Sequence, residues 1–372
     1  MTMSPIPIVP DYAGANVRGI IPALLGPLTW DGTLPGWMPP MLAQADQIVL
    51  LVLDGLGWDQ LQEHAALMPV LSSLAGGRIT TVAPTTTSTA LSSIATGLTP
   101  GEHGLIGYRM VVGGEILNVL RWAVNGDDRR RAYPPADVQR FPAFMGKAVP
   151  VVSPIELTGS AFSEAHLRGS VPVGWRAASS MPVDIRRLLR AGERFVYAYY
   201  GSIDKIAHER GFGDYYEAEL RVADRLVADV LEALPDRAAL LVTADHGQVE
   251  VGERVIKPSA SLLSLCAMQS GEGRFRWFHA RRGAADDLLA AASGEFAESG
   301  WVLSREQLIA DGWFGPTVPP AVAQRLGDVA AIAHEPVSYF DPGDTGPFEL
   351  LCRHGSVTSA EVYVPLVAGM RA

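Results

Sequence analysis

The stretch DQIVLLVLDGLGWDQL, residues 46–61, contains an unbroken run of apolar residues from Ile48 to Leu53. An unbroken rather than alternating run is typical of a strand covered on both faces, as in a parallel sheet flanked by helices. The run ends at Asp54 and Gly55, and ligands of such sheets bind outside the carboxyl ends of the strands. Asp54 is therefore a candidate binding residue, although Asp-Gly pairs also occur in ordinary turns.

Two later apolar runs, residues 195–200 and 238–243, also lead into charged residues. The second run is followed by Asp245, His246 and Gly247. An Asp-His pair at a strand end, next to a glycine that permits close backbone approach, is hard to explain by packing. We therefore interpret Asp245 and His246 as functional residues.

Asp204 and His208 follow the run 195–200 and are four positions apart. In a helical turn both side chains would lie on one face, where they could chelate one ion. The alternative is a solvated turn with salt bridges, because charged residues flank the pair. A further histidine, His354, precedes the last predicted strand, residues 362–368.

Residues 83–108 read APTTTSTALSSIATGLTPGEHGLIGY and contain a run of hydroxyl residues at 85–89. The small residues after this run favour a helix that ends at Gly97. A hydroxyl at a helix start caps free backbone N–H groups, and these groups together with the helix dipole can hold a phosphate or sulfate. Considered alone, the run could be an ordinary helix cap.

The chain has 372 residues, of which 48% are hydrophobic, and a formal net charge of -10. These values indicate a folded globular enzyme. The negative charge argues against a nucleic-acid polymer or a membrane surface as partner, because binding to either requires a basic face. The first residues form no targeting signal, and no run approaches about 18 uninterrupted apolar residues. We therefore expect a cytoplasmic protein that does not bind membranes.

These features predict an α/β fold with a mostly parallel central sheet, helices on both faces and a small α+β insert. Residues 1–44 are rich in Pro and Gly and are expected to form an arm packed on the core. Residues 45–258 and 320–372 would form the metal-binding catalytic core. Residues 259–319, with a hairpin around 271–273, a helix and a further strand, would form the insert or lid.

The chain contains only two cysteines, too few for a thiolate zinc site, so any metal must be held by His and carboxylate side chains. Three Asp and three His suit borderline divalent ions, with zinc the expected ion and manganese or iron as alternatives. Six ligands are too many for one tetrahedral zinc ion and fit two ions, which could clamp a phosphoryl group and ionise a hydroxyl nucleophile. The six candidate ligands are Asp54, Asp204, His208, Asp245, His246 and His354.

Five blocks occur in the order VLDGLG, PTTTSTALSSIATGLTPGEHGLIG, DKIAHERG, TADHG and RHG over roughly residues 46–370. In these blocks the sequence resembles the alkaline phosphatase superfamily, and within it the nucleotide pyrophosphatase/phosphodiesterase branch. The resemblance implies that the metal that binds the nucleophile is held by Asp54, Asp245 and His246. It implies that a second metal is held by Asp204, His208 and His354.

The resemblance also assigns the nucleophile to the fourth residue of the block that begins at Pro84, which is Thr87, and makes it a metal ligand as well. The residues alone do not separate Thr87 from Thr86 or Ser88. Tyr108 departs from the family pattern, because the branch has at this position an asparagine that donates to a phosphoryl oxygen. Loss of such a donor can cost about 3 kcal/mol of transition-state stabilisation. The Tyr108 hydroxyl or a backbone N–H near Ser88 would replace it, or the substrate differs.

The predicted function is a two-metal hydrolase of phosphodiester or pyrophosphate bonds in small, nucleotide-like phosphorylated substrates, acting through a phospho-threonine intermediate. Relatives in the superfamily cleave phosphomonoesters or phosphonates with similar ligands, so these activities are the alternatives. A monoesterase needs extra positive charge for the dianion, for which Arg109 and Arg121 are the candidates unless they lie at the surface. A metal-stabilised binding protein without catalysis is a further alternative. The residues predict no oligomeric state.

Overall fold

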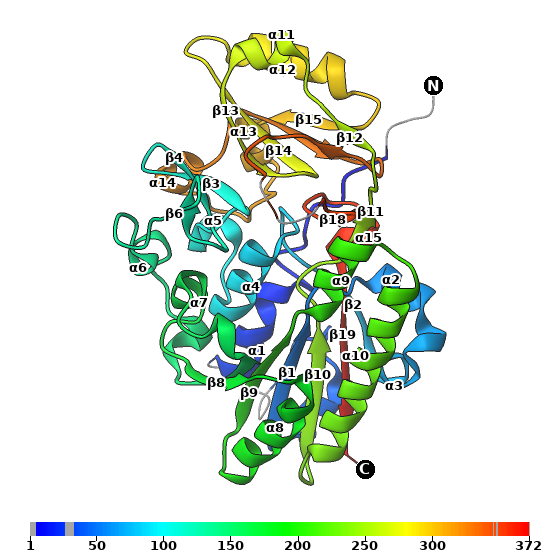
Figure 1. Ribbon diagram of the computed structural model, residues 1–372. Coiled ribbons are helices and arrows are strands. Elements are labelled where there is room, and N and C mark those ends of the chain that lie inside the picture. Colours follow the sequence, from blue (N-terminus) through cyan, green and yellow to red (C-terminus); the bar gives the residue numbers. More distant parts are fainter. Residues whose placement is uncertain (1–4, 27–32, 345, 347–348, 372) are drawn as a thin grey trace.

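The computed structural model describes residues 5–26, 33–344, 346 and 349–371 (Figure 1). Its central element is a seven-stranded sheet with the order β2-β19-β10-β1-β9-β7-β8. Strand β19 runs antiparallel to both neighbours and the other pairs are parallel, which confirms the predicted α/β fold with a mostly parallel sheet. The strands are β1 (Gln47–Leu53), β2 (Ala75–Thr80), β7 (Pro150–Pro154), β8 (Val171–Trp175), β9 (Phe195–Tyr200), β10 (Ala238–Thr243) and β19 (Tyr363–Met370).

Strand β1 lies at the centre of this sheet, between β9 and β10. Its residues from Ile48 to Leu53 are fully buried, as expected for a strand covered on both faces. The parallel register pairs Leu53 with Tyr200, and Val52 with Thr243. The carboxyl ends of the three strands therefore meet at one edge, and the segments that follow them begin side by side.

Helices lie on both sides of the sheet (Figure 1). Helices α8 and α10 pack against strands of the sheet, and α4 packs against α1 and α7. The helices of this core are α1 (Ile20–Leu25), α2 (Trp58–Glu63), α3 (Pro69–Ser73), α4 (Thr87–Thr96), α5 (Pro100–His103), α6 (Pro135–Val138), α7 (Ala161–His166), α8 (Met181–Arg190), α9 (Ser202–Arg210), α10 (Asp214–Ala233) and α15 (Ser359–Val362). Helix α4 begins at the hydroxyl run and ends at Gly97, as the sequence predicts.

Strand β19 runs against β10 and β2, so its first residue, Tyr363, lies at the edge where the parallel strands end. The segment before β19 reaches the same edge. It contains β18 (Cys352–Arg353), which pairs with β11 (Val249–Glu250), and then His354. A reversed last strand is thus what brings His354 to the edge that already carries the segments after β1, β9 and β10.

A second, antiparallel sheet has the strand order β13-β14-β16-β15 and lies beyond the carboxyl ends of the central strands (Figure 1). The predicted boundary of the insert at residue 319 differs from the structure, because β16 pairs with β14 and β15. The reason is that a short, buried apolar strand has the same sequence pattern in either sheet, so only its pairing with β14 and β15 decides to which sheet it belongs. The elements are α11 (Ala260–Leu265), β13 (Cys266–Glu272), β14 (Phe275–Ala280), α12 (Ala285–Phe296), β15 (Gly300–Ser304), α13 (Arg305–Ala310), α14 (Pro320–Ala323) and β16 (Val329–Ala333).

Short strands connect these two parts of the chain. Strands β3 to β6 form a small sheet after α5, and β12 pairs with β17. Their bounds are β3 (Arg109–Val112), β4 (Glu115–Asn118), β5 (Ala123–Val124), β6 (Asp127–Asp128), β12 (Val255–Ile256) and β17 (Ser338–Tyr339).

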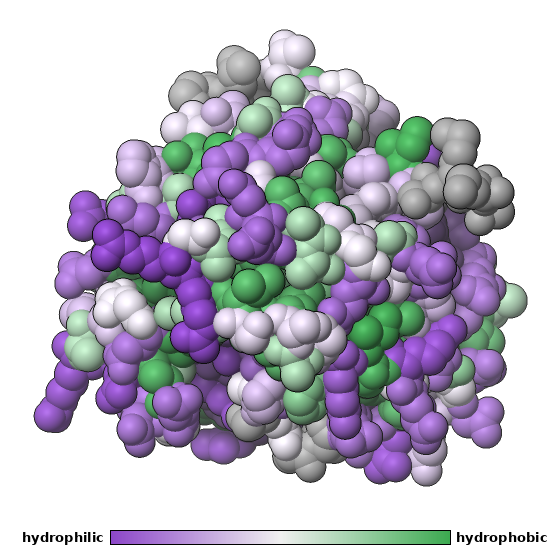
Figure 2. Space-filling view, turned by 90° about the horizontal axis from the view of Figure 1, so that it is seen from above, coloured by the Kyte–Doolittle hydropathy of each residue, from purple (hydrophilic) through white to green (hydrophobic). Residues whose placement is uncertain are grey.

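Seen from the side of the second sheet, hydrophilic and hydrophobic residues are mixed over the surface (Figure 2).

The described part of the N-terminal arm contacts both sheets. The buried Asn16 side chain donates to the Thr81 carbonyl at 2.7 Å, and the indole N–H of Trp301 donates to the Pro5 carbonyl at 2.7 Å. Residues 1–4 and 27–32 of the predicted arm lie outside the described residues. In the described part of the chain, no helix has the length and apolar character needed to cross a membrane.

Candidate metal centre

The six predicted ligands lie at the carboxyl edge of the central sheet in two groups of three. In each group, one donor atom from every residue lies within 4.8 Å of the others. The buried ligand group consists of Asp54, Asp245 and His246, and the outer ligand group consists of Asp204, His208 and His354. This is the grouping that the family resemblance implies.

Local structure explains how each group is assembled. Asp54 directly follows β1, and the Asp245-His246 pair follows β10, so the register of two adjacent strands sets the buried ligand group. Asp204 and His208 lie one turn apart on α9, and the distance from His208 Nε2 to Asp204 Oδ1 is 3.2 Å. His354 completes the outer ligand group from the segment before β19, with its Nε2 at 3.9 Å from the same oxygen.

The buried ligand group has carboxylate oxygens that the protein itself leaves unpaired. Asp245 Oδ1 accepts from the backbone N–H groups of Gly55 and His246 at 3.0 Å each, and Asp54 Oδ2 accepts from the Tyr199 hydroxyl. Asp54 Oδ1 and Asp245 Oδ2 are buried without a hydrogen-bond partner among the described residues. They lie 3.8 Å and 3.3 Å from His246 Nε2. Three ligand atoms thus converge, as a bound cation requires.

The three histidines are oriented by backbone carbonyls. The Nδ1 atoms of His208, His246 and His354 lie 2.6, 3.1 and 2.7 Å from the carbonyl oxygens of Cys352, Gly247 and Thr85. A histidine that donates from Nδ1 has a lone pair on Nε2, which is the arrangement of metal-bound imidazoles. The rings of His246 and His354 stack at 3.7 Å between centroids, so the two ligand groups are adjacent.

Electrostatics also favour cations at this position. Burial and the neighbouring Asp245 and Asp204 carboxylates raise the pKa of Asp54 well above its usual range, and burial raises the pKa of Asp245. Burial and the neighbouring His246 and His208 lower the pKa of His354 well below its usual value. A divalent cation would favour ionised carboxylates and neutral imidazoles together. The Asp/His donor set and the unpaired oxygens therefore fit divalent ions of the zinc class.

Replacing Asp54 by asparagine is expected to raise the melting temperature of the chelator-treated protein by a few degrees and to weaken metal binding. In the unfolded chain at pH 8 Asp54 is ionised, whereas burial and Asp245 oppose that charge in the folded state. Asparagine removes the charge and keeps an acceptor for Tyr199. Melting curves with chelator and with added zinc would test this, and a variant that melts lower than wild type in chelator would contradict it.

Gly55 lets two parts of the site approach each other closely. Its φ of 78° lies in the left-handed region, and a β-carbon there would lie 2.4 Å from Gln248 Nε2 and 2.9 Å from the Asp204 Cα. Gln248 in turn donates to Asp204 Oδ1 at 3.0 Å. The glycine after Asp54 is thus needed for α9 to lie against the end of β1.

Thr87 is the first residue of α4, and its Oγ1 lies 3.1 Å from His246 Nε2. The neighbouring hydroxyls have other surroundings: Ser88 donates to the Gly107 carbonyl at 3.0 Å, and the Thr86 side chain lies beside the carboxyl group of Glu272 and acts to lower its pKa. Among the three hydroxyls left open by the sequence, the structure therefore brings Thr87 next to a ligand of the buried group.

The Tyr108 hydroxyl group forms its hydrogen bond with a residue other than the six candidate metal ligands. The hydroxyl accepts from Asn118 Nδ2 at 2.7 Å, while its backbone N–H donates to Glu272 Oε2 at 3.2 Å. The sequence does not single out Glu272, because it is the last residue of β13 in the second sheet and lies in none of the five blocks that carry the family resemblance. No local signal marks it.

The two arginines considered for a second phosphate charge have other surroundings. Arg109 Nη1 lies 2.5 Å from Asp341 and 2.9 Å from Asp344, and Arg276 pairs with the same two carboxylates. Arg121 is exposed in the turn after β4. Neither Arg109 nor Arg121 therefore offers an unpaired guanidinium group beside the ligand groups.

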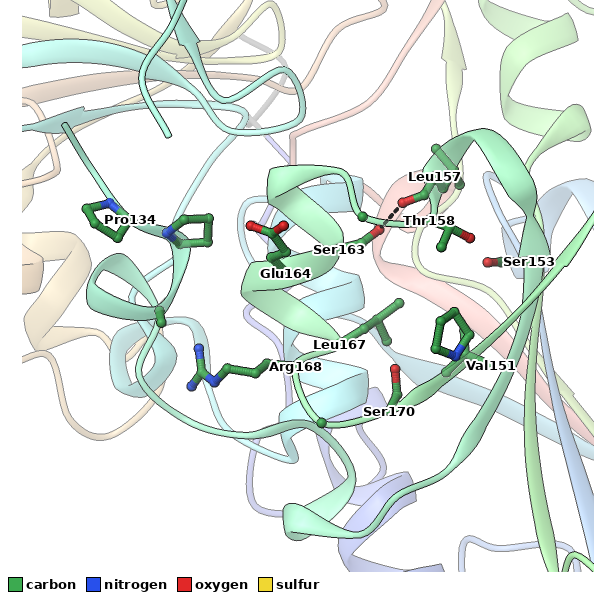
Figure 3. A pocket seen from close by; sticks show the side chains of 15 residues that line it. Pro134, Val151, Ser153, Leu157, Thr158, Ser163, Glu164, Leu167, Arg168 and Ser170 are labelled. Atoms are coloured by element: carbon green, nitrogen blue, oxygen red, sulfur yellow. Dashed lines mark hydrogen bonds between the residues drawn. The ribbon is translucent and has the colours of Figure 1, made fainter. Parts of the chain in front are cut away.

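A separate cavity of about 430 Å³ lies between the start of α6, β7 and α7 (Figure 3). Its lining includes Pro134, Val151, Leu157, Leu167 and Arg168, and none of the six metal-ligand candidates. The Ser163 hydroxyl donates to the Leu157 carbonyl at 2.7 Å within it. The cavity is mostly apolar and is distinct from the metal centre.

Comparisons with known proteins identify the family and the fold of this chain. Residues 48–341 match the family described as type I phosphodiesterase / nucleotide pyrophosphatase. A search of curated proteins found no match. Murine ectonucleotide pyrophosphatase / phosphodiesterase 5 is similar in structure, with 15% identity, a TM-score of 0.65 and coverage of 88% of each chain. The human protein of the same name has 16% identity, a TM-score of 0.65 and the same coverage.

Phosphonoacetate hydrolase from Sinorhizobium meliloti, solved in complex with phosphonoformate, has 18% identity and a TM-score of 0.61, over 88% of this chain and 91% of that chain. At such identities the structural likeness shows a shared fold. The family match is stronger evidence because it spans most of the sequence and includes five of the six ligand candidates and Thr87. The chain belongs to the type I phosphodiesterase / nucleotide pyrophosphatase family.

Proposed function

We propose that this chain hydrolyses phosphodiester or pyrophosphate bonds of nucleotide-like substrates with two divalent metal ions, through a phosphate ester formed on Thr87. The observation that carries the proposal is the contact of the Thr87 hydroxyl with His246, at a helix start beside two adjacent ligand groups. A solved structure of an inactive threonine-to-alanine variant of the murine neighbour contains AMP. That complex supports a nucleotide-like substrate here.

The buried and outer ligand groups would each hold one ion, zinc first, with manganese or iron as alternatives. Two such ions would place positive charge beside the phosphoryl oxygens and would lower the pKa of a hydroxyl nucleophile. The protein itself contributes the first turn of α4, because free backbone N–H groups and the helix dipole favour an anion there. The second sheet, which reaches this region through Glu272, would frame the leaving group.

In the first chemical step, Thr87 Oγ1 forms a bond to phosphorus as the bond from phosphorus to the leaving oxygen breaks. The hydroxyl proton passes to solvent, and the leaving group departs either as a phosphate or, after its oxygen takes a proton from solvent, as an alcohol. In the second step, water attacks the threonyl phosphate, the bond between Oγ1 and phosphorus breaks, and the Thr87 hydroxyl is restored. Positioning of the nucleophile by α4 and His246 makes the first step unimolecular.

Charge at the site favours a singly charged phosphodiester over a doubly charged monoester. Arg109 and Arg276 share Asp341 and Asp344, and Arg121 is exposed, so none of these arginines is free to hold a second phosphate charge. We therefore expect kcat/KM for bis-p-nitrophenyl phosphate to exceed that for p-nitrophenyl phosphate by about tenfold or more, which corresponds to at least about 1.4 kcal/mol.

Assays on zinc-, manganese- and iron-loaded protein would test both the activity and this preference, with phosphonoacetate as a third substrate. A preference for the monoester would contradict the diester proposal. Cleavage of phosphonoacetate alone would indicate a phosphonate hydrolase. Turnover of none of the three by protein that carries two ions would support a binding protein without catalysis.

A further inference from the structure

Glu272 is a buried carboxyl group that the proposed reaction leaves without a role. It is the last residue of β13, its exposed fraction is 6%, and its Oε1 has no hydrogen-bond partner among the described residues. Its Oε2 accepts from the backbone N–H of Tyr108 at 3.2 Å. A buried polar atom without a partner is costly unless a ligand satisfies it.

The surroundings of Glu272 belong to the metal centre. Thr86, whose side chain lies close enough to Glu272 to lower the pKa of its carboxyl group, directly precedes Thr87. A β-carbon on Gly355, which follows His354, would lie 2.7 Å from Glu272 Cγ. A β-carbon on Gly107, whose carbonyl accepts from Ser88, would lie 3.9 Å from Oε1. The carboxyl group therefore lies where three segments meet: the residues just before α4, the segment that follows α5, and the segment that contains His354 and Gly355.

The charges nearest to Glu272 do not neutralise it. Arg276 and Asp344 act on it with opposite signs, and Arg276 is itself paired with Asp344. Two further such groups lie on the described segment before β19 that packs here. His354 directly precedes Gly355. Arg353 lies near the turn after Glu272, because its Nη1 would be 2.8 Å from a β-carbon on Gly273. Burial raises the pKa of Glu272 to about 8.

We propose that Glu272, in its neutral form, donates a hydrogen bond from Oε1 to an oxygen of the phosphoryl group that Thr87 attacks. Because Oε2 accepts from Tyr108, the proton belongs on Oε1, the oxygen that has no protein partner. A neutral carboxyl group is a good donor to an anion, whereas an ionised one repels it. The second sheet thereby contributes a catalytic residue to the core. The inference rests on the proposed function.

The test compares Glu272→Gln with Glu272→Leu in the metal-loaded protein, using bis-p-nitrophenyl phosphate between pH 6 and pH 10. Glutamine keeps an acceptor for Tyr108 and a donor at the Oε1 position, so E272Q should retain kcat/KM at pH 7 within about tenfold. Leucine fills similar space without a donor, so E272L should lose on the order of 10²- to 10³-fold. Wild type should lose activity on the alkaline side as Glu272 ionises, because its pKa is raised by burial, and E272Q should lack that alkaline decline.

Stability provides a readout that needs no turnover. The pKa of Glu272 is raised in the folded state. Its contribution to the free energy of unfolding is therefore complete at pH values below the ordinary pKa of a glutamate, and it is lost as pH rises to about 8. E272Q should therefore melt close to wild type at pH 5 and several degrees higher at pH 9. Glu361→Gln is the matched control, because Glu361 is also buried but pairs with Arg274 at 2.8 Å. E361Q should lower the melting temperature and keep the alkaline decline.

The outcomes separate this inference from the proposed function. Wild-type protein with two ions that cleaves no phosphate ester would contradict the proposed function, while the melting curves would still report on Glu272. An active wild type would overturn the inference in either of two ways: E272Q keeps the alkaline decline, or E272L is as active as E272Q. Equal melting of E272Q and wild type at pH 9 would also overturn it, because Glu272 would then be ionised at no cost.

Discussion

Replacing Thr87 by alanine is expected to lower kcat by on the order of 10⁴-fold or more while the fold and both bound ions are retained. The hydroxyl is the group that would form the bond to phosphorus, and water held in its place lacks the positioning that α4 and His246 provide. Removal of a nucleophile in other hydrolases has effects of this order or larger. Steady-state assays, metal analysis and melting curves on one preparation would measure all three properties.

Two further variants make the result specific. Thr87→Ser keeps a hydroxyl and should keep part of the turnover. Thr89→Ala removes a buried hydroxyl that has no hydrogen-bond partner among the described residues, so it should change stability by about 0.5 to 2 kcal/mol and leave turnover near wild type. Near-normal turnover in T87A, or a phosphate ester trapped on Thr86 or Ser88, would show that the nucleophile is assigned wrongly.

Removing the metal ions is expected to abolish activity and to lower the melting temperature by on the order of 10 °C. A ligand present at a thousand times its dissociation constant stabilises the folded state by about 4 kcal/mol, and two ions would contribute twice that. The unpaired oxygens of Asp54 and Asp245 and the raised pKa values of both side chains are the structural reasons to expect a large effect. Without ions, the buried carboxylates repel one another.

Metal analysis should find close to two ions per chain, and zinc should restore both activity and melting temperature after chelation. His354→Ala offers a control, because it removes one ligand of the outer group and should leave the ion of the buried group in place. We expect close to one ion per chain in H354A. A wild-type protein that binds one ion or none, or one whose melting is unaffected by chelator, would contradict the two-metal proposal.

The blocks of sequence around the strands predicted the fold and the sheet edge that carries the candidate ligands for a physical reason, whereas the division into two groups of three came from the family resemblance. An unbroken apolar strand such as β1 has to be covered on both faces, and parallel strands end at one edge, so Asp54 and Asp245 were expected to meet. The spacing of Asp204 and His208 likewise follows from one helical turn. The family resemblance added the choice of Thr87, which helix capping alone left open.

The long-range pairings could not be predicted in this way. Strand β16 has an apolar sequence that suits either sheet, and its partners β14 and β15 decided that it belongs to the second. The sequence leaves Arg109 open as a phosphate-binding or a surface residue, and only the tertiary structure places Asp341 and Asp344, more than 200 positions later, beside it.

The sequence by itself determined that most candidate metal ligands follow buried strands and that a run of hydroxyl residues starts a helix, because backbone geometry fixes where strand ends and helix starts lie. Only the tertiary structure brings Glu272 of the second sheet beside Tyr108 and beside Gly355, which follows His354. Its burial, its unpaired Oε1 and its contact with Tyr108 arise from packing between segments 164 positions apart. Such contacts depend on how whole sheets pack together, for which no local pattern of residues provides a signal.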